Sequence, residues 1–164
     1  MTEALRVAPE GTKVNTGAEN REAIAKGLAD ILSDTYRLMF KTHAYHWNVE
    51  GPMFYSLHNL TEDQYNDLFK AADEIAERVR ALGFLAPWSL DWMGEQSVIS
   101  SPKKAPSAGE MIEELTSDHE RLAHRLHALV ELAGEDDPVT EDMAIARSAF
   151  HEKATWMLRS LGKS

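Results

Sequence analysis

The sequence of 164 residues contains no cysteine, which excludes disulfide-stabilised folds, zinc ribbons and thiol chemistry. Long apolar runs are also missing, because no segment approaches the roughly 18 apolar residues of a membrane-spanning helix. The first residues, MTEALRVAPEGTKVNTG, lack the apolar core of a secretory signal. From these absences we expect a single cytoplasmic domain with no membrane association.

Basic residues are scarce relative to acidic ones. The chain has 17 lysines and arginines against 27 aspartates and glutamates, and its formal net charge is −10. Such a charge repels nucleic acid and attracts cations. Residues 1–18 are predicted to form an extended arm in which only Arg6 and Lys13 are basic, balanced by Glu3 and Glu10. The arm therefore gives little electrostatic support for DNA binding.

The rest of the chain, residues 19–164, shows helical periodicity and no β-pattern, and we expect it to form one bundle. Capping-box patterns at Thr16–Glu19 and Ser107–Glu110 predict the starts of the first and third helices. Residues 84–106 contain three prolines and are long enough to cross a bundle, with a short helix in the middle. The predicted fold is all-α: four helices with a long crossover between the second and third, at about 19–48, 53–82, 107–132 and 140–161.

The second predicted helix has four side chains of metal-binding type on one face. His58 and Glu62 are one turn apart, as are Asp73 and Glu77, and the four fall within an arc of about 100°. The two pairs are separated by about 16 Å of helical rise. Because metal–ligand bonds are only about 2.0–2.2 Å long, one copy of the helix cannot close both pairs around one ion.

The spacing of these four residues is symmetric. Positions 58 and 77 have the same midpoint as positions 62 and 73, between Asp67 and Leu68. A second copy of the helix, antiparallel across a two-fold axis near this midpoint, would therefore bring each pair against the other. The spacing predicts a homodimer with two intersubunit metal sites. The competing interpretation is a charged stripe that simply faces solvent.

Histidines outside this helix extend the set of candidates. A short connection favours an antiparallel hairpin of the first two helices, which would bring His46 close to His58. His46 is thus a third candidate ligand, with a hydrogen-bonded core histidine as the alternative. On the third predicted helix, His124 and His127 are a further candidate metal-binding pair, although exposed histidines of this kind are more often incidental.

A family resemblance becomes specific at this point. The chain has no Glu-x-x-His motif, so the intrasubunit di-iron centre of ordinary ferritin-like proteins is not supplied. About forty residues instead resemble the signature of the Dps mini-ferritins in ligand order and spacing. The matching positions are His46-Trp47-Asn48, Gly51, Phe54, Leu57-His58, Glu62 and Asp73 to Arg78.

The resemblance implies a ferritin-like bundle whose two-fold dimers assemble into a cytoplasmic dodecamer, a hollow shell with ferroxidase centres at the dimer interfaces. It assigns the ligands to both chains: His46, His58 and Glu62 from one, Asp73 and Glu77 from its partner. Trp47 resembles the tryptophan beside the family's metal centre. Glu62 stands where the family often has aspartate. His43 lies outside the family's usual ligand set and stays open as an extra ligand, an alternative ligand or a polar neighbour.

The expected function is that of a ferroxidase that binds iron. Imidazole and carboxylate ligands suit Fe(II), and the resemblance implies oxidation preferentially by hydrogen peroxide, storage of the ferric product in the shell, and protection against oxidative damage. The alternative is a DNA-binding protein that compacts the nucleoid, with ferroxidase activity secondary. The near-neutral arm departs from the lysine-rich arms of DNA-binding members and so does not favour that alternative. A plain helical scaffold is the third hypothesis.

Overall fold

The computed structural model describes residues 5–163, and within this range the protein contains five α-helices and no β-strand. The predicted all-α fold, with four long helices and a short one in the crossover, is confirmed. The helices are α1 (Arg21–Asn48), α2 (Phe54–Ala81), α3 (Leu90–Gln96), α4 (Ala108–Ala133) and α5 (Pro138–Leu161), and two 3₁₀ turns lie at Glu10–Thr12 and Gly134–Asp136.

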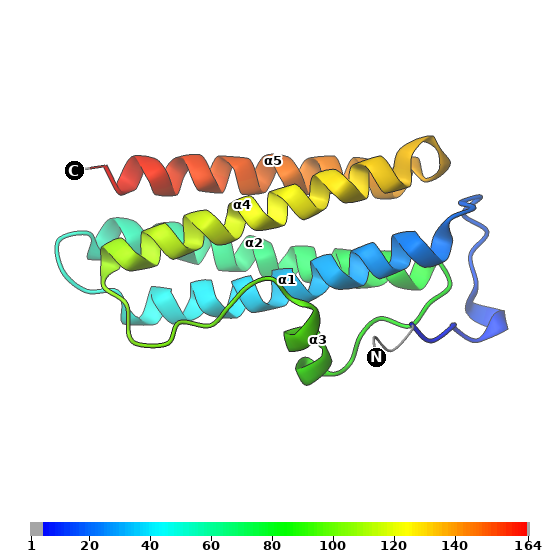
Figure 1. Cartoon of the computed structure of the whole chain (residues 1–164), viewed down its shortest axis with the longest axis horizontal. Helices are drawn as coiled ribbons and strands as arrows, with labels where there is room; N and C mark the ends of the chain where they lie inside the picture. The colour runs from blue at the N-terminus through cyan, green and yellow to red at the C-terminus, as the bar shows by residue number, and fades with distance from the viewer. Residues whose placement is uncertain (1–4, 164) are drawn as a thin grey trace.

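The four long helices form two antiparallel hairpins, α1–α2 and α4–α5, which lie side by side (Figure 1). The segment between α2 and α4 runs along the bundle and places α3 against α1. Ion pairs fix the register between the hairpins. Lys41 of α1 contacts Asp118 of α4 at 2.8 Å, and Arg147 of α5 contacts Asp67 of α2 at 2.6 Å.

The two predicted capping boxes have different outcomes. At the start of α4 the Ser107 hydroxyl accepts from the Glu110 amide at 3.3 Å, and the Glu110 carboxylate accepts from the Ser107 amide at 2.7 Å. The prediction for Thr16–Glu19 is wrong, because α1 begins only at Arg21. Gly17 has a φ of +75°, which takes the chain out of helical geometry, and the Thr16 hydroxyl accepts from the Ala18 amide instead.

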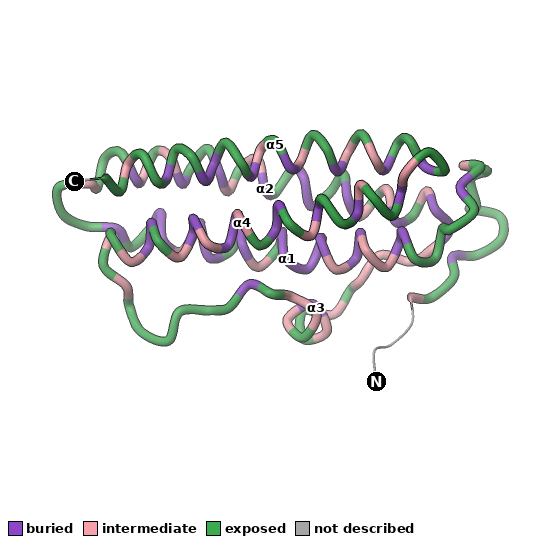
Figure 2. Tube along the Cα trace, turned by 45° about the horizontal axis from the view of Figure 1, so that its top comes forward, coloured by how far each residue is buried: buried purple, intermediate pink, exposed green. Residues whose placement is uncertain are grey.

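The core lies between the four long helices, and buried residues line their facing sides along the whole bundle (Figure 2). Burying these leucine and isoleucine side chains stabilises the fold at about 25 cal/mol per Å² of apolar surface. Large aromatic side chains also remain exposed on the surface of the α1–α2 hairpin: Phe40 is 63% exposed and Phe69 is 61% exposed. The largest fully buried side chains include Leu28, Leu38, Leu57, Leu68, Leu115, Leu122 and Leu158.

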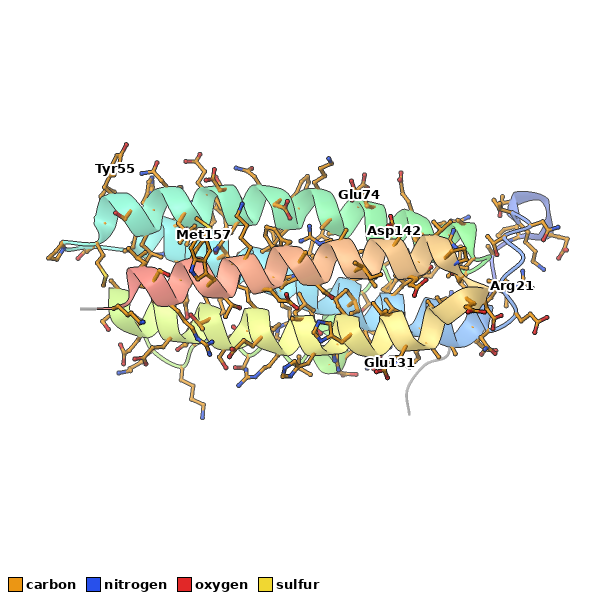
Figure 3. The ribbon with its side chains drawn as sticks, turned by 90° about the horizontal axis from the view of Figure 1, so that it is seen from above. Arg21, Tyr55, Glu74, Glu131, Asp142 and Met157 are labelled. Carbon is orange, nitrogen blue, oxygen red and sulfur yellow. The ribbon has the colours of Figure 1, made fainter. Side chains whose placement is uncertain are left out.

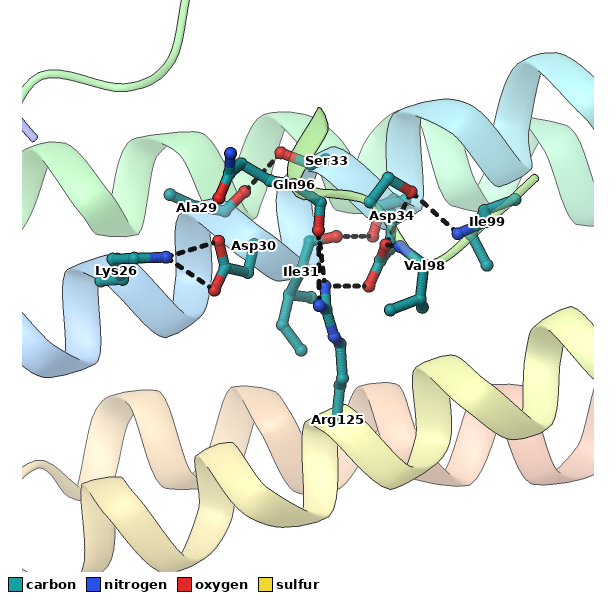
Figure 4. A network of polar contacts seen from close by, with 12 residues as sticks. Lys26, Ala29, Asp30, Ile31, Ser33, Asp34, Gln96, Val98, Ile99 and Arg125 are labelled. Atoms are coloured by element: carbon teal, nitrogen blue, oxygen red, sulfur yellow. Dashed lines mark hydrogen bonds and ion pairs between the residues drawn. The ribbon is translucent and has the colours of Figure 1, made fainter. Parts of the chain in front are cut away.

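A buried carboxylate attaches the crossover to the bundle (Figure 4). Asp34 of α1 accepts hydrogen bonds from the Ser97 hydroxyl at 2.7 Å, the Val98 amide at 2.8 Å and the Arg125 guanidinium at 2.8 Å. Burial raises the pKa of Asp34, and these donors act in the opposite direction. The three donors come from the crossover and from α4, so this one side chain joins three parts of the chain.

The segment before α1 packs against the start of the crossover. Val7 and Phe84 form an isolated antiparallel bridge, and the Ala8 amide donates to the Gly83 carbonyl at 2.8 Å. The first part of the expected arm, residues 1–4, lies outside the described residues, and so does Ser164. Across residues 5–163, none of the helices combines the length and the apolar character needed to traverse a lipid bilayer.

Candidate metal centre

The structure brings His46 and His58 together at the α1–α2 turn. Their rings stack with centroids 3.8 Å apart and an interplanar angle of 18°. Each ring also binds the other residue's backbone: His46 Nδ1 lies 2.8 Å from the His58 carbonyl, and His58 Nδ1 lies 2.8 Å from the His46 carbonyl. The short connection after α1 makes this reciprocal arrangement accessible, as the hairpin prediction requires.

These two hydrogen bonds fix the position of one proton on each ring. A carbonyl oxygen can only accept, so Nδ1 must carry the hydrogen in both histidines. In the neutral tautomer Nε2 then keeps its lone pair, which is the form that a metal ion needs. Backbone carbonyls are typical outer partners of metal-binding histidines because they hold the ring orientation. The same hydrogen bonds would satisfy an ordinary core histidine, so His46 and His58 stay candidate ligands.

Aromatic rings surround the pair. Phe54 stacks on His58 with centroids 4.9 Å apart, and Tyr65 meets His46 edge-on at 5.2 Å. The sequence reasoning did not identify Tyr65. It could have been found from its spacing, because it lies three residues after Glu62 and seven after His58 and therefore shares their helix face.

His43 lies beside the pair, between two aromatic side chains. Its ring centroid is 4.1 Å from that of Tyr65, 4.1 Å from that of Trp47 and 6.1 Å from that of His46. Trp47 is 58% exposed, so this aromatic group extends from the histidine pair to the surface of the subunit. His43 and Trp47 thus lie at the candidate centre, and aromatic packing holds the His43 ring.

The carboxylates lie along one uninterrupted helix, because α2 runs from Phe54 to Ala81 without a break. Glu62, Asp73 and Glu77 are all exposed. Glu62 is one turn from His58, whereas Asp73 and Glu77 are eleven and more residues further along. In the described part of the chain, no three histidine, aspartate or glutamate side chains are close enough to hold one metal ion. A single chain therefore presents the two candidate half-sites separately.

An apolar groove runs along the same face of the subunit. Asp73 lines it together with Tyr36, Phe69, Ala76 and Trp88. Phe69 lies next to the symmetry midpoint of the four α2 positions. Exposed aromatic surface of this kind, next to charged groups, is typical of a protein–protein interface.

Comparisons with known proteins agree with this architecture. Residues 25–163 match the ferritin-like domain family. The chain is 33% identical to DNA protection during starvation protein 2 of Bacillus anthracis over 130 residues, which cover 79% of this chain and 89% of the relative. It is 36% identical to the DNA protection during starvation protein of Brevibacillus brevis over 124 residues, which cover 75% of this chain and 83% of the relative.

Solved structures give the same result. The crystal structure of Dps from Staphylococcus aureus superimposes with a TM-score of 0.84 at 33% identity and covers 90% of this chain and 99% of that one. Dps from Vibrio cholerae, described as a member of a broad superfamily of ferritin-like diiron-carboxylate proteins, superimposes with a TM-score of 0.82 at 28% identity, covering 87% and 91%. The chain therefore belongs to the ferritin-like family and, within it, to the Dps mini-ferritins.

Proposed function

We propose that the protein oxidises Fe(II), preferentially with hydrogen peroxide, at ferroxidase centres shared by two chains, and stores the ferric product in a cytoplasmic shell of twelve subunits. This activity would protect the cell against oxidative damage. The observation that carries the proposal is the reciprocal His46–His58 arrangement, which leaves both Nε2 atoms available one turn from Glu62. Membership of the Dps family supports iron storage and protection in general terms.

The spacing on α2 supports a shared centre. A second copy, antiparallel across the midpoint between Asp67 and Leu68, would add Asp73 and Glu77 to the His46–His58 side of its partner. The same contact would cover Phe69, which is 61% exposed in the single chain. Removing exposed aromatic surface from water favours the dimer, so the apolar and metal-binding features support the same interface.

The ligand types explain the chemistry that we propose. Imidazole and carboxylate both bind Fe(II), and the negative charge of Glu62, Asp73 and Glu77 stabilises the ferric state more than the ferrous state. Two ferrous ions each lose one electron, and one hydrogen peroxide accepts both electrons and two protons to give two water molecules. Because both electrons are accepted together, no hydroxyl radical is released.

The first experiment measures peroxide-driven Fe(II) oxidation in the wild type, His58→Ala and Asp73→Asn. Glu74→Gln is the matched control: it removes a neighbouring carboxylate of α2 (labelled in Figure 3) whose nearest cation is Lys70 at 3.7 Å. We expect slow oxidation in the first two variants and wild-type rates in Glu74→Gln. Wild-type oxidation rates in His58→Ala or Asp73→Asn would show that the substituted residue is not a ligand of the ferroxidase centre.

A second experiment tests whether two chains share the centre. Neither His58→Ala nor Asp73→Asn should be active alone, but a dimer containing one chain of each variant keeps one site with all of its ligands. Random co-assembly should therefore restore activity at about a quarter of the sites. If all ligands came from one chain, mixing would restore nothing, and the two-fold arrangement would be wrong.

The DNA-compacting alternative gains no support from the arm. Its two basic side chains have partners within the subunit: Arg6 lies over the Trp88 ring at 5.1 Å, and Lys13 pairs with Glu10 at 2.6 Å. Phosphate binding would have to compete with these contacts. A mobility-shift titration at low salt, where DNA binding is strongest, checks this conclusion, and we expect no shifted band.

A further inference from the structure

A second group of imidazole and carboxylate side chains lies on the other hairpin, across the seam between α4 and α5. His127 Nε2 of α4 is 3.1 Å from Glu152 Oε1 of α5, and the two side chains are 53% and 60% exposed. His124 precedes His127 by one turn on the same face, and their ring centroids are 6.4 Å apart. None of the three belongs to the centre at His46 and His58.

We propose that His124, His127 and Glu152 form a second metal site, which takes a late first-row divalent transition ion such as Zn²⁺. The site lies within one chain and does not depend on the proposed ferroxidase activity. Two imidazoles and one carboxylate suit Zn²⁺, Cu²⁺ or Ni²⁺, whereas Ca²⁺ and Mg²⁺ prefer oxygen ligands alone.

The separation of His127 and Glu152 fits a shared ion. Two ligand atoms that bind one metal at about 2.1 Å, with an angle of about 90–110° between the bonds, lie about 3.0–3.4 Å apart. The observed 3.1 Å falls in this range, so both atoms can reach one ion with little movement. The two residues come from different helices, and the packing of α4 against α5 brings them together.

His124 completes the site by rotating its side chain. Residues three apart on a helix have Cβ atoms about 5–6 Å apart, and the Glu-x-x-His pairs of di-iron proteins use this spacing to bind one metal. The three side chains do not surround a common point as they stand in the described structure. His124 is exposed, however, so its ring can turn towards His127 without displacing core residues.

The neighbouring charges favour a cation at this position. Glu131 (labelled in Figure 3) follows His127 by one turn and is exposed. Arg159, a nearby cation on α5, is paired with Glu120 at 2.6 Å, so its charge is compensated. Lys153, next to Glu152, is a further basic neighbour, and Arg121 and Arg125 beside His124 are paired with Asp118 and Asp34. Glu131 and the ligand Glu152 thus place two carboxylates beside the two imidazoles.

The test uses Zn²⁺ as the probe on the assembled protein. In zinc-soaked crystals, anomalous diffraction should show a peak about 2.0–2.2 Å from His127 Nε2 and from a Glu152 oxygen. Equilibrium dialysis should show that His127→Ala and Glu152→Gln each bind one zinc ion fewer per chain, whereas the control Glu113→Gln binds the wild-type number. His127 is an exposed residue, so its substitution should not prevent folding.

The absence of a zinc peak at the α4–α5 seam, or unchanged zinc binding in both variants, would overturn the proposal. These outcomes are independent of the ferroxidase assignment. Zinc at His46 and His58 would appear at a different position, and peroxide-driven iron oxidation in His127→Ala reports on the ferroxidase centre alone.

Discussion

In each helical hairpin, two histidines from different helices are in contact, and the two pairs differ in what Nδ1 contacts. In the α1–α2 hairpin, the Nδ1 atoms of His46 and His58 donate to backbone carbonyls. In the α4–α5 hairpin, Nδ1 of His119 lies 2.8 Å from Nδ1 of His151, so one ring must donate to the other. The first pair leaves both Nε2 atoms available, whereas the second uses its nitrogen lone pair internally.

The two histidine pairs also differ in how far they are buried. His119 is 0% exposed and His151 is 1% exposed. Burial lowers the pKa of His119 to about 3, with a further contribution from the Arg147 charge, and burial also lowers the pKa of His151 well below its usual value. The second pair is therefore a neutral, structural hydrogen bond in the core. Two histidines in contact indicate a metal site only when their free nitrogens face a position that a ligand can reach.

Removing one ring from the first pair should mainly lower activity, and removing one ring from the second should mainly lower stability. The loss of activity is the largest expected effect. We expect His58→Ala to lower peroxide-driven Fe(II) oxidation by at least about 10–100-fold, because loss even of an outer partner of a metal ligand has effects of this size. His119→Ala, assayed at equal amounts of folded protein, should oxidise iron at the wild-type rate. A large loss of activity in His119→Ala would contradict the separation of the two pairs.

The stability of the two variants should follow the reverse order. His119→Ala leaves a cavity in the bundle and removes the partner of a buried imidazole, which should cost about 2–5 kcal/mol in the free energy of unfolding. Urea unfolding followed by circular dichroism measures this cost. His58→Ala, at a half-buried position near a turn, should lose less. Equal destabilisation by the two substitutions would contradict the structural role of His119.

The buried pair should also make stability depend on pH. The folded-state pKa values of His119 and His151 lie below the unfolded value of about 6.5, so the unfolded chain binds more protons below about pH 6.5, and for His119 this range extends to about pH 3. Their contribution to stability is fully present above pH 6.5. It is lost as the pH falls, at up to about 1.4 kcal/mol per pH unit for each histidine.

Thermal unfolding of the wild type and of His119→Gln/His151→Gln at pH 7 and pH 4.5 measures this dependence. The glutamines cannot take up the proton, so the double variant should lose less stability on acidification than the wild type. Asp34 and Asp118, whose pKa values are raised by burial, act in the opposite direction and are common to both proteins. An equal acid-induced loss in both proteins would exclude the pair as its source.

The smallest expected effect is that of Glu62→Asp. The substitution keeps a carboxylate one turn from His58 and shortens its reach by one methylene. We expect the oxidation rate to change by less than tenfold, or less than about 1.4 kcal/mol in activation free energy. Stopped-flow oxidation kinetics measure the change. A loss as large as that of His58→Ala would mean that the longer reach of Glu62 is itself required.

The sequence anticipated the local features of the molecule well. The capping box at Ser107, the short helix in the crossover and the single continuous helix that carries His58 to Glu77 are all present. Each depends on residues close together in the chain. The Thr16–Glu19 prediction failed for an equally local reason, because Gly17 adopts a positive φ and delays α1.

Contacts between helices were less accessible to sequence reasoning. Tyr65 was missed as a neighbour of His43 and His46, although its spacing places it on the correct face of α2. The buried pair that His119 and His151 form between α4 and α5 was not identified from the sequence. Which residues meet across two helices depends on their relative rotation and register, which are set by the whole core.

The sequence by itself determined the helical period, the order of the four long helices and the symmetric spacing of His58, Glu62, Asp73 and Glu77. These features follow from the fixed rise and rotation of residues within one helix. Only the tertiary structure decided the protonated nitrogens of His46 and His58 and the burial of His119 with His151. Those properties depend on which carbonyl, ring or solvent each imidazole meets after the helices have packed.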